Sequence, residues 1–236
     1  PTYFFWSLLL LVGLGGVALF AERAVAGGVS AFAASAATVP GSPMEREAER
    51  QHREHTEIFP LILFALFGML LFVAANDLLT LFVALEIFSL PLYLLSGMAR
   101  RRRWLSQEAA LKYFLLGAFS SAFFLFGVAL LYGYAGAFSY AGVAQAIVAD
   151  ESPQVLLLAG LVMLAIGLLF KVGAVPFHTW TPDVYTGAPT PVTGFMAIAT
   201  KTAAVAALLR VFYVALGGAR WDWQPIIATV AVATMV

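Results

Sequence analysis

The chain contains long apolar runs that carry almost no charge. Residues 1–21 and 58–75 hold no charged side chain at all. An α-helix needs about 20 apolar residues to cross the hydrocarbon core of a bilayer. Only 11% of the residues are charged, against about 25% in a soluble domain, so too few polar side chains are present to coat a water-facing surface. These runs therefore predict a protein embedded in a lipid bilayer.

Six runs are long enough to be full spans, and a seventh begins near the end of the sequence. Lipid-exposed sheet edges do not occur in a bilayer, and these runs are too long for barrel strands, so we expect helices. The predicted fold is an all-α, polytopic transmembrane helix bundle with one broken helix. Because the sequence opens without methionine and stops inside an apolar run, we expect part of a longer protein. The predicted spans are 1–21, 58–75, 78–99, 109–135, 155–182 (broken) and 188–216, with the next starting at 225.

Residues 22–57 interrupt this pattern. They begin with Gly, Ala and Ser, pass Pro40 and Pro43, and end in a charged stretch. We expect an exposed linker that includes at most one amphipathic helix. The alternative is a weak extra span over 25–39, although Ala and Gly drive membrane insertion poorly.

Arginines in the loops predict the orientation. Arg100–Arg103 is a run of four, and residues 22–57 add Arg46, Arg50 and Arg53, whereas the loops at 76–77 and 133–154 contain no Lys or Arg. Basic loops face the cytoplasm, and counting spans puts both basic segments on that side. The charges balance, with 13 basic and 13 acidic residues, so we expect the bilayer as a partner and no nucleic acid.

The two basic residue types are distributed differently. All three lysines (Lys112, Lys171 and Lys201) lie inside apolar spans, whereas nine of the ten arginines lie in loops or at span margins. Arginine effectively never loses its proton, while a desolvated lysine readily does. This division suggests lysines that change protonation state.

Glu86 is the only acid deep in a span, and Lys201 lies at a comparable depth in its own span. An ionised group there costs about 2.5 to more than 10 kcal/mol, so it must pair, face water or become neutral. One reading is a static Glu–Lys pair that locks helices together. However, a single acid leaves at least one buried lysine unpaired, which favours proton transfer through Glu86, Lys171 and Lys201.

Lys112 supports two readings equally. It lies near the start of its span, four residues after Glu108. A lysine there can reach the interface and pair with the carboxylate one turn earlier, or it can join the buried lysines as a weaker relay residue.

A helix break follows Lys171. Gly173 and Pro176 come directly after the lysine, and His178 follows them. Irregular backbone at membrane depth is tolerated only against protein or water, and broken helices are where transporters build ion sites. The alternative is an ordinary helix end. His178 fits either a hydrated helix end or a relay, because histidine titrates near neutral pH.

Other chemistry lacks a signature in the sequence. There is no cysteine, nucleotide-binding glycine motif or zinc-protease motif, and the three histidines do not form a metal or haem set. We therefore expect no metal, no cofactor and no redox site in this chain.

Several segments resemble a known family. The run 170–192 together with Lys201 in 199–203 strongly resembles the antiporter-like membrane subunits of respiratory complex I, and 85–92 and 108–117 resemble the subunit N branch of that family. The resemblance covers about residues 58–221, and the linker 22–57 has no counterpart in it.

The resemblance implies a fold of two inverted five-helix repeats, each with a broken helix, of which this chain would hold the first. It makes Glu86 and Lys171 a carboxylate–lysine pair that tunes the lysine, Lys201 the central relay, and Lys112 a further lysine of less settled role. It implies a proton-translocating subunit of NADH:quinone oxidoreductase in a bacterial inner membrane. Neighbouring membrane subunits would be its partners, and other subunits would bind NADH and quinone.

Two rival functions remain at this point. A subunit of a sodium/proton antiporter or of a membrane-bound hydrogenase would share the broken-helix motif. A passive scaffold would use the buried charges only to lock helices together.

Overall fold

A computed structural model describes residues 2–21, 30–32, 41–51, 57–100, 102–149 and 153–236. Within these ranges the regular structure is helical, apart from two isolated β-bridges, so the predicted all-α fold is confirmed. The α-helices are α1 (Thr2–Ala21), α2 (Pro43–Arg50), α3 (Ile58–Ala74), α4 (Leu78–Ser96), α5 (Arg103–Ala135), α6 (Tyr140–Ala149), α7 (Gln154–Val172), α8 (Trp180–Gly187), α9 (Thr190–Phe195), α10 (Lys201–Arg210) and α11 (Arg220–Met235).

Five helical stretches in the described ranges are long and apolar enough to cross a membrane. They are α1, α4, α5, α7 and the continuous stretch Thr190–Ala215, which contains α9 and α10. This makes the chain a multi-pass membrane protein. Helix α3 is also apolar but has 17 residues, a length of about 25 Å. The number of full spans and their repeat pattern remain predictions.

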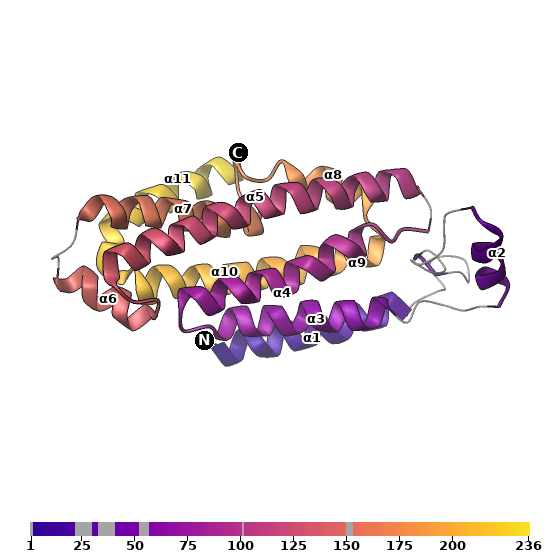
Figure 1. Cartoon of the computed structure of the whole chain (residues 1–236), viewed down its shortest axis with the longest axis horizontal. Helices are drawn as coiled ribbons and strands as arrows, with labels where there is room; N and C mark the ends of the chain where they lie inside the picture. The colour runs from indigo at the N-terminus through magenta and orange to yellow at the C-terminus, as the bar shows by residue number, and fades with distance from the viewer. Residues whose placement is uncertain (1, 22–29, 33–40, 52–56, 101, 150–152) are drawn as a thin grey trace.

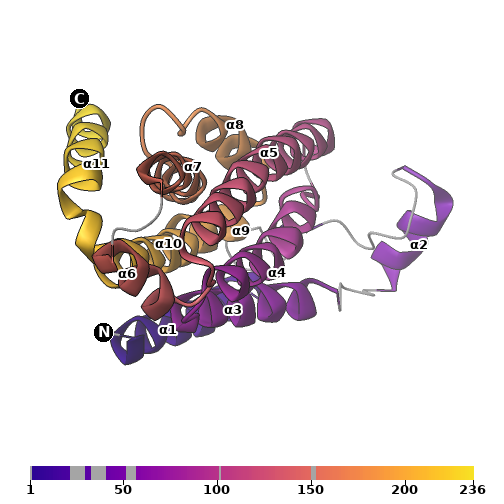
Figure 2. The same ribbon diagram turned by 60° about the vertical axis from the view of Figure 1, so that its left-hand side comes forward.

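The long helices form an elongated bundle. Helices α1 and α3 lie together on one side, α5, α7 and α8 lie on the other, and α4 and α10 run between them (Figures 1 and 2). Helix α4 contacts both α3 and α5, while α10 contacts both α3 and α7. The middle of the bundle is therefore enclosed by α4, α5, α7 and α10.

Small residues allow α5 and α7 to approach closely. A Cβ atom on Gly127 of α5 would lie 2.5 Å from the Leu164 backbone nitrogen, and one on Gly160 of α7 would lie 2.9 Å from Leu131 Cγ. Helices in lipid associate through such packing, because lipid tails are as apolar as the side chains. The two glycines therefore fix the crossing that positions the end of α7.

Helix α7 ends where the sequence places a glycine. Gly173 has φ +77°, a conformation that glycine adopts without penalty. Its N–H donates to the Phe170 carbonyl at 3.1 Å and the Ala174 N–H donates to the Leu169 carbonyl at 3.1 Å, the pattern of a Schellman helix end. Pro176 lies in the connection, and the chain becomes helical again at Trp180.

Part of the segment 22–57 is buried, which differs from the expected exposed linker. Phe32 is fully buried, contacts the Phe20 ring at 5.1 Å and forms a β-bridge with Ala99. The buried carboxylate of Glu45, on α2, pairs with Arg103 at the start of α5. Backbone pairing and this ion pair thus dock the segment on the α4–α5 loop. His52 and His55, and most of the alternative span 25–39, lie outside the described residues.

The opposite end of the bundle contains a helix where we expected only a loop. Helix α6 occupies 140–149, buries Tyr140 and Val143, and joins the α3–α4 turn through the Asp77–Ser139 bridge. A ten-residue apolar helix can form here because it packs along the bundle end instead of crossing the membrane. The two arginine-free connections thus meet at one end, while the two arginine-rich segments meet at the other (Figure 1).

Arg210 lies at the end of the bundle where these two connections meet, and it anchors α10 there. Its guanidinium donates to the Val73 carbonyl at the end of α3 and to the Asn76 side chain in the following turn. Arginine side chains near a helix C-terminus satisfy carbonyls that lack a helical partner. The contact therefore fixes the far end of the helix that begins with Lys201.

Candidate functional site

Lys171 lies in the last turn of α7 and is almost completely enclosed. The residue is 1% exposed, in the middle of the bundle. Its Nζ donates to Ser89 Oγ at 2.8 Å, and the Tyr93 hydroxyl lies at 3.5 Å, both on α4. An isolated ammonium would be very costly here, so these two oxygens are essential neighbours.

Aromatic rings surround the same nitrogen. The Nζ lies 5.5 Å from the centre of the Phe88 ring, 5.5 Å from Tyr93, 5.7 Å from Tyr113 and 6.0 Å from Phe170. A cation within about 6 Å of a ring centre is attracted to the negative face of the ring. The rings of α4, α5 and α7 therefore stabilise a protonated Lys171 without supplying a negative charge.

Trp180 closes this aromatic enclosure from beyond the helix break. Its ring stacks on Tyr113 at 4.8 Å and on Phe170 at 5.3 Å, and its Nε1 donates to the Phe170 carbonyl at 3.0 Å. The start of α8 thus folds back onto the end of α7. The surroundings of Lys171 therefore depend on the geometry of the break.

Glu86 is near this enclosure but does not touch the lysine. It lies on α4, one turn before Ser89, is half-buried, and accepts a hydrogen bond from Ser121 Oγ of α5 at 2.5 Å. Both Glu86 and Lys171 are in the described part of the chain, and no ion pair within 4.0 Å joins them. The static locked pair considered from the sequence is therefore absent from this conformation.

Lys201 reaches the helix break from α10. Its half-buried side chain donates from Nζ to the carbonyl of Val172, the residue after Lys171, at 2.7 Å. The C-terminal end of a helix carries partial negative charge that attracts a cation. Lys201 thus stabilises the end of α7 while lying beside the backbone of the enclosed lysine.

Two hydroxyl groups near Lys201 lack partners. Thr181 Oγ1 and Tyr185 Oη are buried and form no hydrogen bond in the described structure, and the Lys201 Nζ lies 6.0 Å from the centre of the Tyr185 ring. A Cβ on Gly173 would lie 3.0 Å from the Lys201 Nζ and 3.2 Å from Thr181 Oγ1. Because Gly173 has no side chain, a small space lined by polar groups is left at the helix break.

Lys112 is not part of this cluster. Its side chain is 42% exposed and its Nζ lies 2.7 Å from Glu108 and 2.7 Å from Asp183. The pairing with Glu108 is the contact considered from the sequence, and Asp183 adds a partner on α8. Lys112 therefore links α5 to α8 at the outer edge of the bundle.

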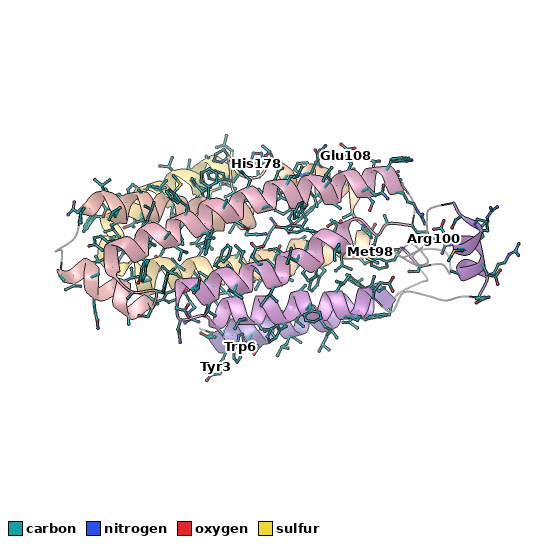
Figure 3. All side chains as sticks on the ribbon, in the orientation of Figure 1. Tyr3, Trp6, Met98, Arg100, Glu108 and His178 are labelled. Carbon is teal, nitrogen blue, oxygen red and sulfur yellow. The ribbon has the colours of Figure 1, made fainter. Side chains whose placement is uncertain are left out.

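His178 is also away from the cluster. It lies exposed in the break, and its backbone carbonyl accepts from the Thr181 N–H at 2.9 Å. Figure 3 shows His178 and Glu108 on the outer edge of the bundle, with Arg100 toward the end that carries α2. Neither Lys112 nor His178 forms a hydrogen bond or ion pair with Glu86, Lys171 or Lys201 in this conformation.

Sequence reasoning missed the side chains that touch Lys171 and Glu86. No single feature of the sequence marks Ser89, Tyr93 or Ser121 as a site residue. However, polar residues occur at 86, 89, 93 and 96, at spacings of three, four and three. Such a spacing places side chains on one face of a helix. This polar face of α4 was the available signal, whereas Ser121 and Tyr113 of α5 have no comparable pattern.

Comparison with known proteins identifies the family. The family model described as NADH:quinone oxidoreductase/Mrp antiporter, TM matches residues 75–236, which include all the candidate relay residues. The chain belongs to this NADH:quinone oxidoreductase/Mrp antiporter family. The resemblance found in the sequence is thereby confirmed.

Relatives in this family are similar along the whole chain. A protein of Nocardioides sp. named NADH-quinone oxidoreductase subunit N is 63% identical over 236 residues, which is 100% of this chain and 44% of that protein. A protein of the same name from Rhodococcus opacus is 58% identical and also covers this chain fully, with 47% of its own length matched. The chain thus spans less than half the length of these family members.

Solved structures show the same antiporter-like fold. A chain of respiratory complex I from Thermus thermophilus matches 89% of this chain and 39% of its own length, with TM-score 0.66 and 39% identity. A chain of the Mrp complex from Dietzia sp. matches 98% of this chain and 39% of its own length, with TM-score 0.73 and 25% identity. Both structures are those of complexes.

Proposed function

We propose that this chain is part of a proton-translocating membrane subunit of NADH:quinone oxidoreductase, in which Glu86, Lys171 and Lys201 relay protons. The observation that carries the proposal is the enclosure of Lys171, which holds an ionisable nitrogen inside a membrane bundle without a directly bound carboxylate. An ionisable group at such a position is expensive and usually functional. The relatives named subunit N support the choice of complex.

In this relay the distance between Glu86 and Lys171 controls whether Lys171 is protonated. When the two groups approach, the carboxylate favours the protonated lysine; when they separate, the proton is released toward Lys201. Lys201 is suitably placed, because it binds the carbonyl of the residue that follows Lys171. A tenfold change in protonation needs only about 1.4 kcal/mol, so a modest change in this distance is sufficient.

The same proposal includes the placement of the chain. Residues 1–21 form one span, 22–57 and the Arg100–Arg103 loop face the cytoplasm, and 58–236 form the antiporter-like helices of the first of two repeats in a bacterial inner membrane. Its partners are other membrane subunits of the complex, including neighbouring antiporter-like subunits. NADH oxidation and quinone reduction take place in other subunits, and this chain holds no cofactor.

The likeness to the Mrp complex favours a second candidate, a subunit of a cation/proton antiporter. The two candidates differ in the energy source. Proton movement driven by quinone reduction supports the first, whereas movement that needs a sodium gradient and no electron donor supports the second.

Proton pumping by the full-length protein in its assembled complex, reconstituted in vesicles, tests the relay. We expect Lys171→Ala, Lys201→Ala and Glu86→Ala each to lower the pumping stoichiometry. Full stoichiometry in all three variants would contradict the relay. If the charges only lock helices together, the combined Lys171→Met and Glu86→Leu variant will keep both assembly and pumping.

A further inference from the structure

Lys171 is held in place by neutral groups. Its closest oxygen belongs to Ser89, at 2.8 Å, and the Glu86 carboxylate is engaged by Ser121. Ser89 and Lys171 are both buried, with 0% and 1% exposure. The hydroxyl of Ser89 therefore determines where the nitrogen lies when the carboxylate is not bound to it.

In this conformation Ser89 can only accept a hydrogen bond from Lys171. Its single proton is donated to the Leu85 carbonyl one turn earlier, at 2.5 Å, and a serine hydroxyl has one donor and two acceptor lone pairs. Its lone pairs are thus available to the ammonium of Lys171. A neutral amine retains two N–H donors and gains a lone pair, so it can also accept a hydrogen bond from a hydroxyl, which the ammonium cannot do.

We propose that Ser89 is a positioning residue for Lys171, accepting from its ammonium and donating to its neutral amine after the hydroxyl rotates away from the Leu85 carbonyl. This inference rests on the proposed relay. It explains how one site holds the nitrogen in both protonation states while the carboxylate moves. No proton is transferred through Ser89 in this scheme.

Tyr93 is the other polar side chain beside the Lys171 Nζ. Its hydroxyl lies 3.5 Å from the Lys171 Nζ, and its ring packs edge-on against Tyr113 at 4.6 Å. The Tyr93 hydroxyl is therefore too distant to replace Ser89 without a shift. Among the described residues, the titratable groups around Lys171 include Glu86 and Tyr93 of α4, Tyr113 of α5, Lys201 of α10 and, behind Trp180, Tyr185 of α8.

The pH dependence of pumping by the assembled, full-length complex in vesicles tests this role. Ser89→Ala removes one atom and both hydrogen-bond functions. Hydrogen bonds to charged groups are stronger than those to neutral groups, so the ammonium loses more than the amine. We expect the alkaline half-maximum of pumping to fall by about one pH unit.

Ser96→Ala is the matched control. Ser96 lies on the same face of α4, is fully buried and also donates to a carbonyl one turn earlier, at 2.8 Å, but its other neighbour is the sulfur of Met196 at 3.8 Å. Its substitution removes the same kind of helix contact and leaves Lys171 untouched. The Ser96→Ala profile is expected to match that of the unsubstituted complex.

Ser89→Thr retains a hydroxyl and is expected to restore the original profile. If Ser89→Ala fails to assemble, Ser89→Cys replaces it, because a thiol is a weak donor and acceptor and should shift the profile in the same direction. Coinciding profiles for the Ser89 and Ser96 variants would overturn the inference. The relay itself would fail separately, through a Lys171→Ala complex that pumps normally.

Discussion

Lys171 and Lys112 are the same residue type in neighbouring apolar helices, but they have opposite surroundings. Lys112 is 42% exposed and contacts two carboxylates at 2.7 Å. Lys171 is 1% exposed and contacts a serine hydroxyl and aromatic rings. The solvent-accessible Lys112 therefore has charged partners, whereas the enclosed Lys171 has no charged group in direct contact.

Under the proposed relay, Lys112 is a structural lysine and Lys171 is one whose protonation state changes. Two carboxylates contact Lys112 and link α5 to α8. The groups in direct contact with Lys171 are neutral, so in the proposed relay the position of the more distant Glu86 carboxylate decides the protonation of Lys171. The two lysines therefore differ both in burial and in the groups that contact them.

The largest contrast is expected between Lys171→Met and Lys112→Met. Loss of a positioned proton-transfer group lowers a rate by about 100-fold or more, so Lys171→Met should nearly abolish proton pumping in vesicles. Lys112→Met should keep most of it, because Lys112 contacts neither Lys171 nor Lys201. Equal losses of pumping in the two variants would show that the two lysines do not differ in function.

A smaller contrast is expected between Glu86→Gln and Glu108→Gln. Both changes remove a negative charge from a helix of the bundle, but only Glu86 lies near the enclosed lysine. An interaction of about 1 kcal/mol alters a protonation equilibrium about fivefold, so pumping at alkaline pH should fall about fivefold in Glu86→Gln. Glu108→Gln should leave the pH profile unchanged, and a shift there would show that Lys112 also takes part.

Gly173→Ala tests the space beside Lys201, with Gly136→Ala as its control. Both glycines end a helix with positive φ, at +77° and +65°, but an added Cβ at Gly136 has nothing within 4 Å, whereas at Gly173 it lies 3.0 Å from the Lys201 Nζ. The backbone penalty of about 1–2 kcal/mol is shared. Thermal unfolding should therefore show a larger loss of stability for Gly173→Ala, and equal losses would mean that the space is not restrictive.

The smallest effect is expected from Asp183→Asn. The Asp183 side chain is 55% exposed and Lys112 retains Glu108, so the free energy of unfolding should fall only slightly, because an exposed ion pair contributes little to stability. Proton pumping should be unaffected. A pumping defect in this variant would give the outer lysine a role that its contacts do not suggest.

Much of the fold could be predicted because the bilayer imposes a simple requirement. Apolar runs of helix-spanning length predicted an all-α bundle, and Gly173 and Pro176 lie where the backbone leaves the helix. Helix α6 and the docking of Phe32 could not be predicted from this requirement. They depend on packing and backbone pairing at the bundle ends, where span length is not a guide.

The candidate site was predictable only in its ionisable members. Glu86, Lys171 and Lys201 are conspicuous because charges are rare in apolar spans. Their contacts were not predictable. The family resemblance implied a Glu86–Lys171 pair, whereas in the structure Ser89 lies against the lysine and Ser121 against the carboxylate. Which of several nearby polar groups meets a buried charge depends on helix rotation, and sequence spacing fixes that only within one helix.

Lys171→Arg tests the central claim most directly, because arginine keeps the positive charge but effectively never releases its proton. Pumping by the assembled complex in vesicles is the measurement, with Lys112→Arg as the control for size and shape. A relay predicts that Lys171→Arg assembles and loses pumping while Lys112→Arg pumps normally. Normal pumping by the Lys171→Arg complex would show that a fixed charge is sufficient and would contradict the account.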